Sequence, residues 1–250
     1  MIELDRRQYD VIWFDLDDTL IDFRLNSHRA MESLFRETVL KDYFKEVEDW
    51  WNAYYPVNNR LWTEYGNGEI SADFLRSERF YRPLVNSGMS ESEAREIAPS
   101  LDNDYLYRLS KEKSLIPGAL NLLQRLREAG FSIGVLSNGF NPVQQRKIES
   151  AGLTSFIDYT VLSEDIGVTK PDTRLFEHAM DISGIVSPKR HVMIGDNPST
   201  DIRGAVDAGW KAILLDRYGL LYVNHPAEKI ANFEEILVKK RIFSPKKVQK

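Results

Sequence analysis

The sequence contains no cysteine among its 250 residues. It therefore has no disulfide framework and no thiolate ligand for a metal ion. It also lacks an uninterrupted apolar run of the roughly 20 residues that a membrane-spanning helix requires. The start of the chain, Met1 to Asp10, lacks the apolar core of a signal peptide. These absences predict a cytoplasmic protein without a membrane partner.

The chain has no strong charge bias, because 33 lysine and arginine residues face 38 aspartate and glutamate residues, for a formal net charge of −5. This overall charge gives no reason to expect binding to a nucleic acid polymer. Hydrophobic residues make up 42% of the chain. This proportion and the chain length are typical of one large globular α/β domain or two smaller ones.

One stretch near the start of the chain combines a short apolar run with several residues that could bind a metal ion or take part in catalysis. Residues 11–14 (VIWF) form a short apolar run of the kind found in a strand buried on both faces. Asp15, Asp17 and Thr19 follow the run directly. Parallel sheets bind ligands at the carboxyl ends of their strands. Because neighbouring carboxylates repel unless a cation offsets their charge, the stretch predicts a divalent metal site at the end of this strand.

The remaining pattern falls into two parts. From about residue 26 to residue 108 the apolar residues recur at helical spacing, with Ser27 expected to cap the first helix and Pro56 to break a later one. From Leu115 onward, apolar strands alternate with amphipathic helices. The expected strands cover residues 131–136, 159–162, 191–194 and 211–215. Such alternation predicts a parallel sheet with helices on both faces.

We therefore predict an α/β protein with a doubly wound parallel sheet, a Rossmann-like core, and an inserted all-helical domain. The first strand and its loop are expected in residues 1–22, the helical insert in residues 23–112 and the remainder of the core in residues 113–250.

Polar residues follow four of the positions at which the core strands are expected to end. These residues are Asp15 and Asp17, Ser137 and Asn138, Lys170 in a loop, and Asp196. The parallel-sheet rule gathers such positions at one edge of the sheet, although more than a hundred residues separate the first from the others.

At these positions the chain resembles the haloacid dehalogenase superfamily of phosphohydrolases. Residues 15–19 (DLDDT) are similar to its first motif and Ser137-Asn138 to its second. Lys170-Pro171 is similar to the third motif, and Gly195-Asp196 with Asp201 to the fourth. The four motifs occur in the order of the superfamily and span nearly the whole chain.

The resemblance implies a catalytic role for several residues. Asp15 would attack phosphorus and form an aspartyl-phosphate, while Asp17 would protonate the leaving alcohol and then deprotonate the attacking water. Ser137 and Asn138 would bind the phosphate, and Lys170 would place a positive charge on it. Dehalogenases of the superfamily lack the acid–base aspartate at the position of Asp17, because a halide leaves without a proton.

The resemblance also implies a bound Mg²⁺, an ion that prefers oxygen ligands and contacts substrate phosphate. Its expected ligands are the carboxylate of Asp15, the backbone carbonyl of Asp17 and the carboxylate of Asp196. Asp201 leaves two interpretations open, namely support of the metal site or a favourable negative charge at the start of a helix.

The helical insert occurs where the superfamily places a C1-type cap that closes over the site and excludes water. Residues 57–70 and 137–140 are similar to the corresponding stretches of bacterial pyrimidine 5′-nucleotidases of the YjjG type. This resemblance implies nucleoside 5′-monophosphates as substrates. Trp62 is the ring that we expect to contact the base, since aromatic rings stack on bases; the alternative is that Trp62 packs in the core of the cap.

These observations predict a magnesium-dependent phosphomonoester hydrolase for a small-molecule phosphate ester, with nucleoside 5′-monophosphates as the expected substrates. The alternatives within enzymes are a small-metabolite or sugar phosphatase and a phosphoglucomutase-like transferase. The alternative outside enzymes is a phosphate-binding regulator. The oligomeric state does not follow from the sequence.

Overall fold

The computed structural model of the protein describes residues 1–221 and 227–240. The chain divides into two compact units. Unit 1 consists of residues 1–20, 115–137 and the described part of 153–250, and unit 2 consists of residues 21–114 and 138–152. The predicted core segment 113–250 thus includes residues 222–226 and 241–250, which lie outside the described residues.

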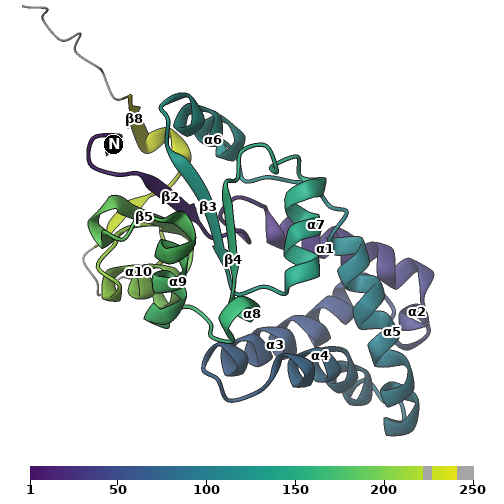
Figure 1. Ribbon diagram of the computed structural model, residues 1–250. Helices are drawn as coiled ribbons and strands as arrows, with labels where there is room; N and C mark the ends of the chain where they lie inside the picture. The colour runs from purple at the N-terminus through teal and green to yellow at the C-terminus, as the bar shows by residue number, and fades with distance from the viewer. Residues whose placement is uncertain (222–226, 241–250) are drawn as a thin grey trace, which may run out of the picture. The chain divides into compact units, whose positions relative to one another are not determined.

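Unit 1 is built on a six-stranded parallel sheet with the strand order β4-β3-β2-β5-β6-β7 (Figure 1). Its strands are β2 (Val11–Phe14), β3 (Ser132–Ser137), β4 (Tyr159–Leu162), β5 (His191–Gly195), β6 (Lys211–Leu215) and β7 (Glu228–Ile230). Strand β2 lies in the middle of the sheet. The next two strands in the chain, β3 and β4, lie on one side of it, and β5, β6 and β7 lie on the other, which is the Rossmann order. The predicted doubly wound parallel sheet is confirmed.

The other elements of unit 1 connect these strands or extend them. They are α6 (Ala119–Glu128), α8 (Ser163–Ile166), α9 (Thr173–Ser183), α10 (Arg203–Asp207) and the short turns η1 (Pro188–Arg190), η2 (Pro198–Ile202) and η3 (Phe233–Glu235). A separate two-stranded parallel sheet pairs β1 (Ile2–Asp5) with β8 (Ile236–Lys239). We did not predict β1, β7 and β8, because each is short and includes charged residues, so it lacks the continuous apolar run of β2.

Strand β2, at the centre of the sheet, is held in place by the ring of Trp13. Trp13 pairs in register with Gly134 of β3, where a Cβ atom would lie 2.2 Å from the indole. Only glycine therefore lets the ring lie across β3. On the other side of β2, Trp13 Nε1 donates a hydrogen bond of 3.0 Å to Nδ1 of the buried His191 on β5. The indole thus links β2 to both neighbouring strands.

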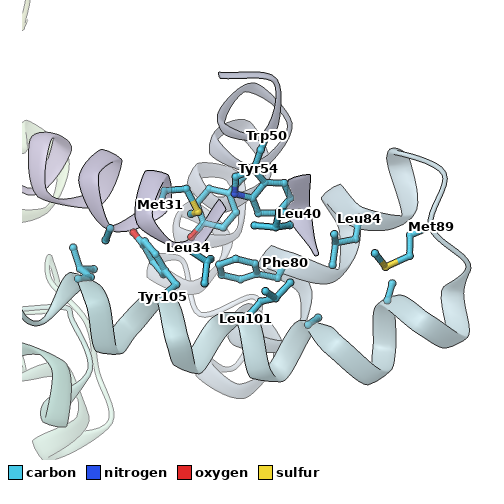
Figure 2. Packing of buried hydrophobic residues seen from close by; sticks show 14 residues of the cluster. Met31, Leu34, Leu40, Trp50, Tyr54, Phe80, Leu84, Met89, Leu101 and Tyr105 are labelled. Atoms are coloured by element: carbon cyan, nitrogen blue, oxygen red, sulfur yellow. The ribbon is translucent and has the colours of Figure 1, made fainter. Parts of the chain in front are cut away.

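Unit 2 is all-helical. Its helices are α1 (Phe23–Glu37), α2 (Leu40–Tyr43), α3 (Val47–Gly66), α4 (Ala72–Asn86), α5 (Glu91–Leu109) and α7 (Asn141–Ser150). Buried side chains of α1 to α5 form the larger of its two apolar clusters, in which Trp50, Tyr54 and Phe80 pack with ring centroids 5.0–5.6 Å apart (Figure 2). Among the described residues, no helix combines the length and the apolar character that crossing a bilayer requires.

Two local predictions for unit 2 are wrong. Helix α1 begins at Phe23, and the Asp22 side chain caps it by accepting from the backbone N–H of Leu25. Ser27 lies inside α1, and its hydroxyl is 2.6 Å from the Tyr105 hydroxyl. Helix α3 also continues through Pro56. Its buried positions Trp50, Tyr54, Asn58 and Leu61 keep helical spacing on both sides of the proline. This packing outweighs the cost of about 3 kcal/mol of an interior proline.

The environment of His191 predicts an acid-sensitive contribution to stability. Burial lowers the pKa of His191 below its ordinary value of 6.5. Its Nε2 lies 2.7 Å from the carbonyl of Ile185, so the neutral ring donates there and accepts from Trp13 at Nδ1. Protonation of Nδ1 would place its N–H opposite the N–H of Trp13, so that this hydrogen bond would be lost. The unfolded chain binds the proton near pH 6.5, so the folded state loses stability as pH falls below that value.

We predict that His191→Gln makes the free energy of unfolding less dependent on pH between about 7.5 and 5.5, since glutamine offers the same acceptor and donor without titrating. A single proton changes this free energy by at most about 1.4 kcal/mol per pH unit. Urea unfolding of both proteins across this range measures the difference. Other titrating groups contribute equally to the two curves, so parallel curves would contradict the prediction.

Candidate active site

The site begins where β2 ends. Asp15 follows Phe14 directly, and its backbone N–H donates to the carbonyl of Ile194 on β5 at 3.0 Å. The chain then turns, with Asp18 at a φ of 58° and a hydrogen bond of 3.0 Å from the Leu20 N–H to the Leu16 carbonyl. This turn keeps the Asp15 carboxyl group at the carboxyl end of the central strand, where it is 9% exposed.

A buried lysine from a distant loop lies against Asp15. The loop between α8 and α9 brings in Lys170, which is 2% exposed. Its Nζ donates to Asp15 Oδ1 at 2.5 Å and to the carbonyl of Leu136 on β3 at 2.8 Å, and it lies 2.7 Å from Asp201 Oδ1. All three Nζ protons therefore have an oxygen acceptor. One ammonium group ties together β2, β3 and η2.

Asp201 faces Lys170 from the turn η2. Its Oδ2 accepts from the backbone N–H of Asn197 at 3.0 Å. A Cβ atom on Gly195 would lie 2.2 Å from Asp201 Oδ2, so the close approach of this carboxylate to β5 requires glycine. Of the two interpretations that the sequence left open, a negative charge at a helix start does not account for these contacts. Asp201 is an ion-pair partner of the buried lysine.

Asp196, at the end of β5, completes a cluster of carboxylates. Its Oδ1 accepts from the Thr19 hydroxyl at 3.2 Å. One carboxylate oxygen each from Asp15, Asp196 and Asp201 lie within 4.8 Å of one another. Among the described residues, Lys170 is the cation paired with this cluster, so two negative charges remain without compensation when all three aspartates are ionised.

Burial and the neighbouring charges shift the pKa values of these residues. Burial raises the pKa of Asp15 to about 7, although Lys170 opposes this shift. Burial and the carboxylates of Asp201 and Asp15 raise the pKa of Asp196 to about 8. Burial lowers the pKa of Lys170, but the carboxylates of Asp15 and Asp201 outweigh it, so the net pKa is raised and the lysine stays charged.

These residues fit a divalent cation. The donors are carboxylate oxygens of the buried Asp15 and Asp201 and the half-buried Asp196, which suit a hard ion such as Mg²⁺. The raised pKa values mean that the bare cluster retains protons at neutral pH, and a cation of charge +2 would take their place. The cluster therefore can hold a metal ion. It includes the carboxylate of Asp201, which we did not assign as a ligand, and does not include the carboxylate of Asp17.

The remaining predicted site residues are spread over both units. Ser137 is buried at the end of β3, next to β2, and Asp17 is half-buried two residues after Asp15. Asn138 and Trp62 belong to unit 2. The Trp62 ring stacks on Phe140 with centroids 5.1 Å apart. Trp62 thus packs within an apolar cluster of its own unit and remains partly exposed.

The family of the chain follows from comparison with known proteins. The family model described as haloacid dehalogenase-like hydrolase matches residues 9–209, a range that includes Asp15, Lys170, Asp196 and Asp201. The chain belongs to this family. The family members similar to it include phosphatases and 5′-nucleotidases, so this member is an enzyme of the hydrolase class.

Two related sequences and one solved structure show which proteins this hydrolase is similar to. It is 31% identical to the pyrimidine 5′-nucleotidase YjjG of Escherichia coli, over 84% of this chain and 88% of the relative. It is 30% identical to the phosphoserine phosphatase of Thermus thermophilus, over 83% and 88% of the two chains. The crystal structure of the HAD hydrolase YfnB of Bacillus subtilis, which was bound to magnesium, superposes with a TM-score of 0.80 at 25% identity, over 91% and 96%.

The carboxylate cluster predicts that Mg²⁺ stabilises the fold. An ion present at about 100 times its dissociation constant adds about 2.7 kcal/mol to the free energy of unfolding. For a chain of this size, that corresponds to a rise of about 5–10 °C in Tm. Asp196→Asn should remove most of this rise, because it removes one negative charge from the cluster.

Thermal unfolding with Mg²⁺ and with a chelator measures both effects without relying on activity. Asp207→Asn serves as the matched control, since Asp207 is 44% exposed on α10 and pairs with Arg203. An equal rise in Tm for the wild type and Asp196→Asn would contradict a metal site at this cluster.

Proposed function

We propose that this hydrolase is a magnesium-dependent phosphomonoesterase that works through an aspartyl-phosphate and acts on nucleoside 5′-monophosphates. The observation that carries the proposal is the buried Lys170–Asp15 pair within a cluster of carboxylates at the end of β2. Phosphoryl transfer depends mainly on positioning and on neutralising the charge of the transferred oxygens. A fixed carboxylate beside a fixed ammonium supplies both conditions.

In this proposal, the Asp15 carboxylate attacks phosphorus while the ester bond to the leaving alcohol breaks. Lys170 Nζ holds the carboxylate in position through its 2.5 Å hydrogen bond, so the nucleophile does not reorient before attack. The same ammonium group offers positive charge to the phosphate oxygens. Asp201 keeps Lys170 protonated and in place, since its Oδ1 lies 2.7 Å from Nζ.

Asp17 is the proposed general acid and base. It gives a proton to the leaving alcohol and then takes one from the water that attacks the aspartyl-phosphate, so Asp15 returns to its starting state. Ser137, buried at the end of the neighbouring strand, is proposed to donate its hydroxyl to a phosphate oxygen, with Asn138 also contacting the phosphate. Mg²⁺, held by Asp15, Asp196 and the backbone carbonyl of Asp17, would neutralise charge on the phosphate when bound.

The substrate class is inferred from the relatives and from the sequence of the helical unit. The nucleotidase and the phosphoserine phosphatase match at 31% and 30% identity, so overall similarity does not separate a nucleotide from a phosphoserine substrate. The stretch of residues 57–70, which resembles pyrimidine nucleotidases and contains Trp62, supports the nucleotide. Selectivity is accordingly assigned to the helical unit, which we propose to act as the cap expected in residues 23–112.

The cytoplasmic location expected from the sequence also stays a prediction.

Asp15→Asn should abolish phosphate release, because an amide cannot form the acyl phosphate. Release of inorganic phosphate from phenyl phosphate with Mg²⁺ measures this chemistry, and Asp207→Asn, at an exposed position, should retain full activity. Circular dichroism verifies that Asp15→Asn is folded. Turnover by this variant above the level of a mock preparation would contradict the covalent mechanism.

A screen of substrates with the wild type separates the remaining functions. Faster release from uridine or cytidine 5′-monophosphate than from phosphoserine and sugar phosphates supports the nucleotidase. Transfer of phosphate between positions of a sugar would identify a mutase. Binding of phosphate without any turnover would identify a regulator.

Trp62→Ala should raise the KM for pyrimidine nucleotides by about 5- to 150-fold, because stacking on a base is worth roughly 1–3 kcal/mol. The KM for phenyl phosphate should change much less, and kcat should be kept for both, since a contact made equally in ground and transition states appears in KM. Trp51→Ala is the matched control, as Trp51 stacks on Tyr55 in the same unit.

The Trp62 ring also packs on Phe140, so Trp62→Ala should lower Tm. If the ring only packs, the variant will lose both activities in the same proportion. That result would assign Trp62 to the core of unit 2 instead of to substrate recognition.

A further inference from the structure

Unit 2 contains a charged pair buried between two of its helices. Arg79 of α4 donates from Nε to Oδ1 of Asp102 on α5 at 2.5 Å, and both side chains are 3% exposed. The other oxygen, Asp102 Oδ2, accepts from Nε of Arg76 at 3.0 Å. Arg79 does not form the two-point pair that a guanidinium group often makes with a carboxylate, and Asp102 Oδ2 accepts from Arg76 instead.

One nitrogen of Arg79 is consequently buried without a hydrogen bond. Its Nη2 finds no acceptor among the residues that the structure describes. A buried donor without a partner costs about 1–3 kcal/mol, and more when it is charged. Folded proteins retain few such groups, and each requires an explanation. Holding α4 to α5 does not explain this nitrogen, since the pair with Asp102 already does so.

The surrounding charges favour an electron-rich ligand. Asp102 faces two guanidinium groups, those of Arg76 and Arg79. The adjacent Glu78 does not neutralise the excess, because it accepts from Arg82 Nε at 2.8 Å and from Arg95 Nη1 at 2.6 Å. Positive charge therefore exceeds negative charge around the unsatisfied donor. Such a donor binds most strongly to an oxygen atom that carries negative charge or a large dipole.

Aromatic rings from other helices lie near the guanidinium group, and one of these rings is hydrogen-bonded to an amide. Its carbon is 5.6 Å from the centroid of the Tyr105 ring, and the Tyr105 and Tyr54 rings are 5.9 Å apart. Both rings belong to the core shown in Figure 2. The Tyr54 hydroxyl donates to Asn58 Oδ1 at 3.1 Å. A guanidinium group, an amide and two flat rings are the groups with which proteins bind a planar ring that carries carbonyl oxygens.

The pair is also connected to solvent through Arg76. This side chain is 38% exposed and, besides Asp102, contacts Asn103 Oδ1 at 2.9 Å. The Asp102 carboxylate is therefore in contact with a side chain that reaches solvent. Rotation of Arg76 away from Asp102 would free Oδ2 of that carboxylate.

We propose that Arg79, with Asn58 and the Tyr54 and Tyr105 rings, forms a subsite within unit 2 that binds an oxygen acceptor of a small molecule. The shared chemistry is a carbonyl or carboxylate oxygen that accepts from Arg79 Nη2. Because the proposed function favours nucleotides, the expected source is the carbonyl of a pyrimidine base. The alternative source is the carboxylate of an amino acid such as serine.

Calorimetric titration with uridine, cytidine and serine tests the subsite, since none of these probes carries a phosphate. We expect the pyrimidine nucleosides to bind the wild type and Arg79→Met to weaken that binding at least tenfold. Arg79→Lys should also weaken it, because lysine keeps the charge but loses the planar fork. Arg95→Met, which changes an arginine that is 53% exposed in the same unit, should bind as the wild type does.

A double variant, Arg79→Met with Asp102→Leu, keeps the test valid if the single variant unfolds. Replacing both members of a buried ion pair by apolar residues is often neutral or stabilising, so this variant should stay folded and still lose binding. Tighter binding of serine than of either nucleoside would assign the carboxylate as the ligand. Unchanged binding in both Arg79 variants, or no binding of any probe at up to about 10 mM, would overturn the subsite. Phosphate release from phenyl phosphate reports on the proposed function separately.

Discussion

The ion pairs and hydrogen bonds of the Lys170 ammonium group are the interactions on which the arrangement of unit 1 depends. Its three acceptors come from the end of β2, from β3 and from the turn after β5, so three separate segments meet at one nitrogen. Removing the charge would leave two buried carboxylates unpaired, which is far more costly than losing one hydrogen bond. The same contacts that position the proposed nucleophile therefore also hold the edge of the sheet together.

Close packing of the backbone makes this edge possible. Gly195 allows the Asp201 carboxylate to lie against β5, and Gly134 allows the Trp13 ring to cross β3. In both places a side chain would lie at an impossible distance from its neighbour. Trp13 also joins β2 to β5 through His191, two residues before Asp15. The strand that carries the proposed nucleophile is thus held on both sides.

The main cluster of buried charged groups has an excess of negative charge in unit 1 and an excess of positive charge in unit 2. In unit 1, the three carboxylates of Asp15, Asp196 and Asp201 face the one ammonium group of Lys170, and the missing positive charge matches a divalent cation. In unit 2, the one carboxylate of Asp102 faces the guanidinium groups of Arg76 and Arg79, and Nη2 of Arg79 is left without an acceptor among the described residues. Burial makes either imbalance costly, so each marks a place where a ligand of opposite character would be stabilised.

The sequence by itself determined the parallel sheet and the motif residues at its edge, because a run such as residues 11–14 followed by aspartates has few other physical explanations. It did not determine the short strands β1, β7 and β8, the continuity of α3 through Pro56, or the contacts of Asp201. These depend on partners distant in the chain, as with Asp201 and Lys170. The unsatisfied nitrogen of Arg79 likewise depends on how the side chains of α4 and α5 meet, which spacing along the chain does not reveal.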